Sequence, residues 1–122
     1  MRIWMPGVSF DRFAVVVVPF PFTDRDTSLR RPALVLSDKA FVADSGSHVL
    51  AMITRAARSN WPLDVTLTDI ATAGLAVECR VRMKLFTLDT NLVLKHVGRL
   101  GERDAHAVMD ALARLFGLNT TD

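Results

Sequence analysis

The sequence predicts a mostly-β single domain, a small closed or nearly closed barrel with one helix packed on it. Three observations predict this fold class. Several short apolar segments, rich in β-branched residues, alternate with polar loops. Only the last segment has apolar residues at helical spacing. The length of 122 residues and the hydrophobic content of 50% fit one domain whose core needs no disulfide.

The first half of the predicted barrel holds three strands. Residues 13–20 (FAVVVVPF) form an apolar run without polar alternation, which is typical of a strand buried on both faces. A polar loop over 23–30 leads to a second strand at 32–37. A connection with one helical turn at 38–47 then leads to a third strand at 48–54.

The second half has weaker elements before its helix. They are a basic loop at 55–61, a half-exposed strand at 63–68, a helical turn at 68–74 that glycine ends, and strands at 77–87 and 91–97. Because side chains alternate along a strand, Arg80, Arg82 and Lys84 are expected on one face.

The chain closes with an amphipathic helix. From Glu102 to Phe116 the apolar residues recur at helical spacing, and Gly117 is placed to cap the C-terminus. We therefore expect a loosely ordered lead-in at 1–12, one barrel domain at 13–118 and a tail at 119–122.

Composition narrows the class of protein. Cys79 is the single cysteine, so no internal disulfide forms, and no Cys/His cluster has zinc spacing. The start lacks the apolar core of a signal peptide, and no stretch reaches the length of a membrane helix, so a reducing cytoplasm is the expected compartment.

Net charge is only +2, but twelve of the fifteen basic residues are arginine, whose planar fork matches phosphate oxygens. Compositional bias toward Arg, Ala and Val explains this count better, so the positions of the arginines must decide.

Two positions stand out as candidates for phosphate chemistry. Arg31 precedes Pro32, so its backbone is held extended at the start of a strand. Thr54 ends an apolar strand, where its hydroxyl emerges at the rim, and Arg55 and Arg58 follow it. The plain alternatives are an exposed arginine pair at a strand start and a threonine that caps a loop.

Other candidate groups carry weaker signals. The row Arg80, Arg82 and Lys84 fits a groove that follows a nucleic-acid backbone, or equally a solvated face beside Asp64. No spacing brings two of the three histidines together as an acid–base pair, which favours structural roles for them. The common glycine-rich nucleotide motifs and the G-x-S-x-G motif are absent from the sequence.

Taken together, an ordered set of segments resembles the MazF/PemK family of toxin endoribonucleases, nearest to its PemK-like branch. The matching strings are VVVVPFPFTD (15–24), RRPALVLSD (30–38), AMIT (51–54), WPLDV (61–65), AGL (73–75), VRMKLFTLD (81–89) and GRL (98–100), followed by the closing helix. Relatives commonly have an aspartate where Ala14 stands and a serine where Arg55 stands.

The resemblance implies a fold, an activity and partners. The fold is an SH3-like twisted β-barrel, as in MazF, PemK and CcdB, with short helices and a C-terminal α-helix. The activity is cleavage of single-stranded RNA without a metal or other cofactor, through attack of the 2′-hydroxyl on the adjacent phosphate. The protein is expected to act as a homodimer in a type II toxin–antitoxin system, with a cognate antitoxin as partner and no membrane association.

The resemblance also implies site residues. Arg31 and Thr54 fall on the catalytic positions, and the active-site loop falls on Thr23, Asp24 and Arg25. The expected RNA-binding residues are Arg30, Arg55, Arg58, Arg82 and Lys84. Two other functions stay open at this point: a degraded barrel that binds RNA or protein, and a gyrase poison, against which the ending GLNTTD argues.

Overall fold

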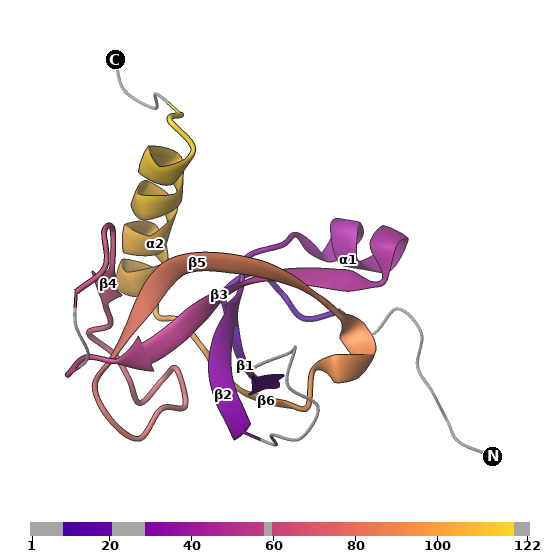
Figure 1. Cartoon of the computed structure of the whole chain (residues 1–122), viewed down its shortest axis with the longest axis horizontal. Coiled ribbons are helices and arrows are strands. Elements are labelled where there is room, and N and C mark those ends of the chain that lie inside the picture. The colour runs from indigo at the N-terminus through magenta and orange to yellow at the C-terminus, as the bar shows by residue number, and fades with distance from the viewer. Residues whose placement is uncertain (1–8, 21–28, 58–59, 119–122) are drawn as a thin grey trace.

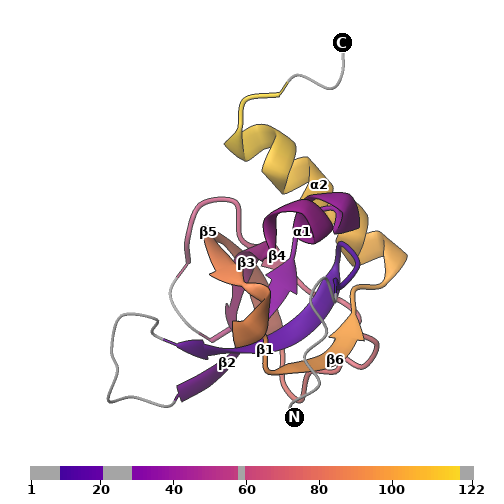
Figure 2. The ribbon, with the colours of Figure 1, turned by 90° about the vertical axis from the view of Figure 1, so that its right-hand side faces the viewer.

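The protein is a curled, six-stranded antiparallel sheet that forms a half-barrel, with one helix at its C-terminus (Figures 1 and 2). The computed structural model describes residues 9–20, 29–57 and 60–118. The strand order across the sheet is β4-β5-β3-β2-β1-β6. The elements are β1 (Ala14–Phe20), β2 (Leu29–Val35), α1 (Lys39–Ser45), β3 (Ser47–Arg55), β4 (Val65–Thr66), β5 (Cys79–Asp89), a 3₁₀ turn η1 (Thr90–Leu92), β6 (Lys95–Arg99) and α2 (Glu102–Leu115). The predicted mostly-β class and closing helix are confirmed.

The sheet buries apolar side chains on both of its faces. In β1, Val15 packs into one buried cluster, whereas Val16 and Val18 pack into the other. This explains why the strand has no polar alternation, because neither of its faces meets water. The first cluster also receives Val108 and Ala111 from α2, so this helix covers one face of the sheet. Figure 1 shows α2 beside β4 and the first half of β5.

A buried carboxylate joins α2 to the loop that follows β4. Asp104, in the first turn of the helix, is 1% exposed. Its oxygens accept hydrogen bonds from the backbone N–H of Thr68 at 3.0 Å, from the hydroxyl of Thr68 at 2.8 Å and from the N–H of Asp69 at 3.0 Å. A buried charge requires such partners, so Asp104 fixes where the helix meets the loop.

Two glycines allow the turn at 69–74 to lie directly against β6. A Cβ on Gly74 would lie 2.1 Å from the carbonyl oxygen of Val97, and a Cβ on Gly98 would lie 2.4 Å from the carbonyl carbon of Ala73. Gly74 also has a φ of +76°, which favours glycine. Any side chain at either position would push these segments apart. This close contact fixes the position of the chain at Gly74, where the segment 75–78 begins.

Several predicted boundaries are wrong, and local hydrogen bonding explains them. The second strand starts at Leu29 because Leu29 and Arg30 pair with Phe20 and Pro19 of β1. The strand predicted at 63–68 is reduced to two residues. The last strand starts at Lys95, because the side chain of Asp89 caps the N–H of Asn91 and starts a 3₁₀ turn. The amphipathic helix and its left-handed Gly117 cap are confirmed.

Candidate functional site

A surface pocket of about 440 Å³ opens where β2 and β3 separate. The β2–β3 ladder covers only Ala33 to Val35 on the first strand. It ends next to Pro32, which has no N–H with which to continue it. From there β2 stays paired with β1, and β3 stays paired with β5. Figure 1 shows the two strands running apart. The pocket is lined by Leu29, Arg30, Arg31, Pro32, Ile53, Thr54, Arg55, Leu75, Ala76, Val77 and Cys79.

The two predicted catalytic residues line this same pocket from opposite strands. Ala33 pairs with Met52 at the end of the ladder, and Arg31 and Thr54 each lie two residues farther along their own strands, on the same face as these two residues. Directly opposed residues project on the same face of a sheet. Arg31 is also held from its other side, because its guanidinium carbon lies 5.3 Å from the ring centroid of Phe20. The pocket lining therefore includes both Arg31 and Thr54.

The lining is strongly basic. Among the described residues, it contains Arg30, Arg31 and Arg55 and no aspartate, glutamate or histidine. Within residues 9–20, 29–57 and 60–118, none of these three arginines forms an ion pair with a carboxylate. Uncompensated arginines in a concave site attract an anion such as a phosphate.

Cys79, which also lines the pocket, is a neutral thiol. The side chain is buried, and burial raises the pKa of the thiol, although the charge of Arg55 acts in the opposite direction. A thiol held neutral is a poor nucleophile. The sequence-based preference for a packed cysteine is therefore supported, and the polar chemistry of the pocket comes from the arginines and Thr54.

The other predicted site residues fall into three groups. Arg30 and Arg55 lie in the pocket lining. Arg82 and Lys84 lie outside that lining, on β5, where both contact the ring of Trp61. The remaining four, Thr23, Asp24, Arg25 and Arg58, lie outside the described residues. The expectation that Arg80, Arg82 and Lys84 share a face is confirmed for the two arginines, which pair with Thr54 and Met52 of β3.

The charge of Arg82 is paired with a carboxylate, so the row of cations on β5 is not the fully unpaired groove that the sequence suggested as one alternative. Its Nε and Nη2 donate to the two carboxylate oxygens of Asp64 at 3.1 and 2.9 Å. Burial alone raises the pKa of Asp64. Hydrogen bonds from Arg82 and the Trp61 N–H, together with the positive charges of Arg82 and Arg80, outweigh burial and lower the pKa below its usual value. The ion pair is therefore intact at neutral pH.

The lowered pKa of Asp64 predicts how stability responds to acid. A group with a depressed folded-state pKa stabilises the fold above its unfolded pKa of about 3.9, and this contribution is lost as the pH falls through the folded-state pKa. Between about pH 5 and pH 3, thermal unfolding of Asp64→Asn should lose less stability than the wild type does. The control Asp110→Asn, on an exposed position of α2, should follow the wild-type curve. If the stability of Asp64→Asn and of the wild type fell equally as the pH is lowered, the ion pair would not be the source of the pH dependence.

His48 takes a structural position, as expected. His48 is completely buried, and its Nε2 accepts the backbone N–H of Phe10 at 3.2 Å. Burial lowers the pKa of His48, which keeps the ring neutral. The structure does bring His96 close, since the ring of Phe10 contacts both imidazoles. Neither histidine lines the pocket.

Asp11 does not replace the aspartate that relatives carry at the position of Ala14. Its carboxylate lies 3.6 Å from Nζ of Lys39. Ala14 itself is buried at the start of β1. Among the described residues, Phe20 is instead the side chain that contacts the guanidinium of Arg31.

Sequence reasoning missed some of the residues that shape the site. It did not include residues 75–77, which line the pocket and follow the close contact at Gly74. The AGL string at 73–75 contains the glycine that makes this contact, but the string entered the prediction only as part of the family resemblance. It also missed that Phe20 supports Arg31 and that Asp64 holds Arg82. The spacing in WPLDV, an aspartate three residues after an exposed tryptophan, is typical of a side chain that closes its own turn.

Two further findings concern the described residues as a whole. Within residues 9–20, 29–57 and 60–118, no group of three or more His, Cys, Asp or Glu side chains could hold a metal ion. In the same part of the chain, no helix is long and apolar enough to cross a membrane.

Comparison with known proteins gives a family and a fold. The family model described as PemK-like, MazF-like toxin of type II toxin–antitoxin system matches residues 11–116. No curated protein matches the sequence significantly.

Solved structures with the same fold include several toxins. MazF in a MazE–MazF complex from Deinococcus radiodurans is 25% identical, with a TM-score of 0.71 over 91% of this chain and 98% of that one. An endoribonuclease in complex with its cognate antitoxin, from Mycobacterial species, is 16% identical, with a TM-score of 0.72 over 93% and 99%. The Mycobacterium tuberculosis toxin MazF-mt6 is 20% identical, with a TM-score of 0.68 over 87% and 98%. The match of the family model over nearly the whole chain shows that the protein belongs to the PemK-like, MazF-like toxin family of type II toxin–antitoxin systems.

Proposed function

We propose that this protein is a metal-independent endoribonuclease toxin that cleaves single-stranded RNA with Arg31 and Thr54. The observation that carries the proposal is that these two residues line one basic pocket from neighbouring strands. Family membership supports a nuclease role at the level of the family. The positions of the two side chains support the specific assignment.

The chemistry requires little more than this pair. RNA carries its own nucleophile, the 2′-hydroxyl, and attack on the adjacent phosphate passes through a pentacovalent phosphorane with extra negative charge. The guanidinium of Arg31 can bind two non-bridging oxygens. As the bond from the 2′-oxygen to phosphorus forms and the bond to the 5′-oxygen breaks, the 2′-hydroxyl proton passes to water and the leaving 5′-oxygen takes a proton from water. The hydroxyl of Thr54 can donate a hydrogen bond to the same oxygens. Arg30 and Arg55 add positive charge for the flanking phosphates.

The part of the pocket lining that the structure describes holds no acidic side chain, which supports this assignment. A carboxylate beside Arg31 would compete with the phosphate for the guanidinium. No carboxylate of the described lining competes in this way, so charge developing on the phosphorane can meet donors that are already in place.

The test is an RNA cleavage assay in EDTA with identification of the product ends. We expect a 2′,3′-cyclic phosphate and a 5′-hydroxyl, and no cleavage of DNA, because DNA lacks the nucleophile. Cleavage that needs added metal, or ends with a 5′-phosphate, would contradict the proposal. Binding without cleavage of any of a broad set of RNAs would favour the alternative of a catalytically degraded RNA-binding barrel.

The partners follow from the same proposal. Similar structures contain MazF with MazE and an endoribonuclease with its cognate antitoxin, which supports a cognate antitoxin for this protein. We also propose a homodimer, and the cytoplasm as the compartment in which the toxin meets its RNA.

A further inference from the structure

An exposed tryptophan with two cations against its ring lies on the loop before β4. Trp61 is 40% exposed. The Nζ of Lys84 lies 4.3 Å from the centroid of its ring, and the guanidinium carbon of Arg82 lies 5.9 Å from it. Aromatic rings accompanied by cations are the usual elements of sites that bind single-stranded nucleic acid, because bases stack on the ring and phosphates pair with the cations.

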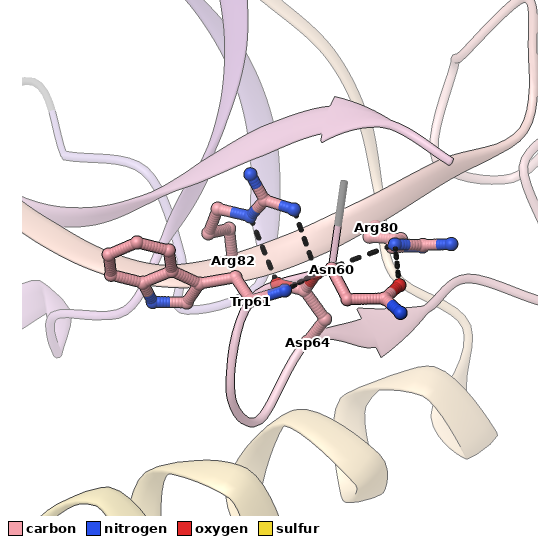
Figure 3. Close-up of polar contacts among 5 residues, drawn as sticks. All are labelled: Asn60, Trp61, Asp64, Arg80 and Arg82. Carbon is pink, nitrogen blue, oxygen red and sulfur yellow. Dashed lines mark hydrogen bonds and ion pairs between the residues drawn. The ribbon is translucent and has the colours of Figure 1, made fainter. Parts of the chain in front are cut away.

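One carboxylate holds the backbone of Trp61 and one of the two cations beside its ring. Asp64 accepts two hydrogen bonds from Arg82, and its Oδ2 also accepts the backbone N–H of Trp61 at 3.1 Å. The same Oδ2 lies 3.6 Å from Nη1 of Arg80, which donates to Oδ1 of Asn60 at 2.7 Å. Figure 3 shows Asp64 between the two arginines, with the indole extending past Arg82. These contacts attach the loop at 60–64 to β5, so the tryptophan is positioned before a ligand binds.

This cluster continues the face that carries the catalytic pair. Arg80 pairs directly with Thr54, and Arg82 pairs with Met52. Paired residues on neighbouring antiparallel strands lie on the same face, with Cβ atoms about 5 Å apart. A strand of RNA whose reacting phosphate lies at Thr54 can therefore continue over Arg80 to Trp61 without crossing to the other face of the sheet.

The charge of the cluster also favours an anionic ligand. Arg80, Arg82 and Lys84 carry three positive charges, and Asp64 carries one negative charge. Asp64 engages the two arginines, whereas Lys84 is exposed beside the ring. Lys84 is therefore the cation best placed to pair with a phosphate.

We propose that Trp61, Arg82 and Lys84 form a second RNA subsite beside the catalytic pocket, in which a base stacks on the indole and a neighbouring phosphate pairs with Lys84. The subsite rests on the proposed nuclease function for its substrate. It supplies affinity and positions the strand, while Asp64 acts as a positioning residue that holds Arg82 and the backbone of Trp61. Because every base has a stacking face, this subsite tolerates different bases.

The sequence offers a direct spectroscopic test. The chain has two tryptophans and no tyrosine, so the Trp4→Phe variant leaves Trp61 as the sole tryptophan emitter. We expect a short single-stranded DNA, which binds without being cleaved, to quench this emission in a saturable manner. Trp61→Ala should raise the KM for RNA cleavage about tenfold with little change in kcat, and Trp61→Phe should restore part of the loss.

Two further variants separate a subsite from a general structural effect. Lys84→Gln should weaken binding of the oligonucleotide and reduce the slope of its salt dependence by about one. The control Phe41→Ala removes another exposed aromatic side chain, on α1 and outside both sites, and should leave KM unchanged. Thermal unfolding of each variant shows whether it is folded.

The outcomes distinguish the subsite from the nuclease function. If the Trp4→Phe protein cleaves RNA but its emission does not change at saturating DNA, the subsite is wrong and the nuclease function stands. If emission is quenched but no RNA is cleaved, the subsite stands and the nuclease function fails. Equal quenching by an acidic polypeptide would overturn the assignment to nucleic acid, because it would identify a docking site for an acidic protein segment.

Discussion

Replacing Arg31 with alanine is expected to lower the rate of RNA cleavage by about 10²–10³-fold or more, the usual effect of losing one donor to a developing oxyanion. The loss should appear mainly in kcat, because the guanidinium is most strongly engaged when charge builds on the phosphorane. Arg31→Lys should recover little of this loss, since an ammonium cannot bind two oxygens in one plane. Single-turnover cleavage of a short RNA measures the effect.

Arg103→Ala is the matched control for this prediction. Arg103 is an exposed arginine on α2 and does not belong to the pocket lining. Its removal changes the net charge equally and should leave the rate within about twofold of wild type. Equal losses in both variants would mean that overall charge, and not the position of Arg31, controls cleavage.

The second large effect is expected on stability, from Asp104→Ala. The substitution removes the acceptor of the hydrogen bonds from Thr68 and Asp69 and leaves their donors without a partner at the base of α2. We expect the free energy of unfolding to fall by about 2–4 kcal/mol, since bonds to a buried charge are among the strong ones. For a chain of this size, that corresponds to a fall in Tm of about 10 °C.

Asp110→Ala provides the comparison for Asp104→Ala. Asp110 belongs to the same helix but is exposed, so its loss should change the free energy of unfolding by no more than about 0.5 kcal/mol. Chemical denaturation of both variants gives the two values. A similar small change in both would show that Asp104 does not carry the contact between α2 and the loop.

Much of the fold could be predicted from the sequence because its signals are local and strong. The unbroken valine run of β1 and the helical spacing of α2 each reflect burial of a whole face, and both predictions are confirmed. The short β4 and the late start of β6 could not be predicted in the same way. Their limits depend on single side-chain contacts, such as the cap that Asp89 provides, and on pairing with strands distant in sequence.

The candidate site was predictable only in part, for a related reason. Pro32 restrains Arg31 locally, but that Arg31 and Thr54 line one pocket depends on how β2 and β3 pair and where they separate. Pairing of Arg82 with Asp64 likewise depends on how the loop at 60–64 folds back onto β5. A row of cations in a sequence does not reveal which of them a carboxylate already engages.

The most direct measurement is a crystal structure of the protein with a short RNA that carries a 2′-deoxy sugar at the cleavage position. The proposed mechanism predicts one phosphate in the pocket between β2 and β3, with its non-bridging oxygens within hydrogen-bond distance, about 3 Å, of both the Arg31 guanidinium and the Thr54 hydroxyl. A phosphate held by other residues, or contacts from only one of the two side chains, would contradict it.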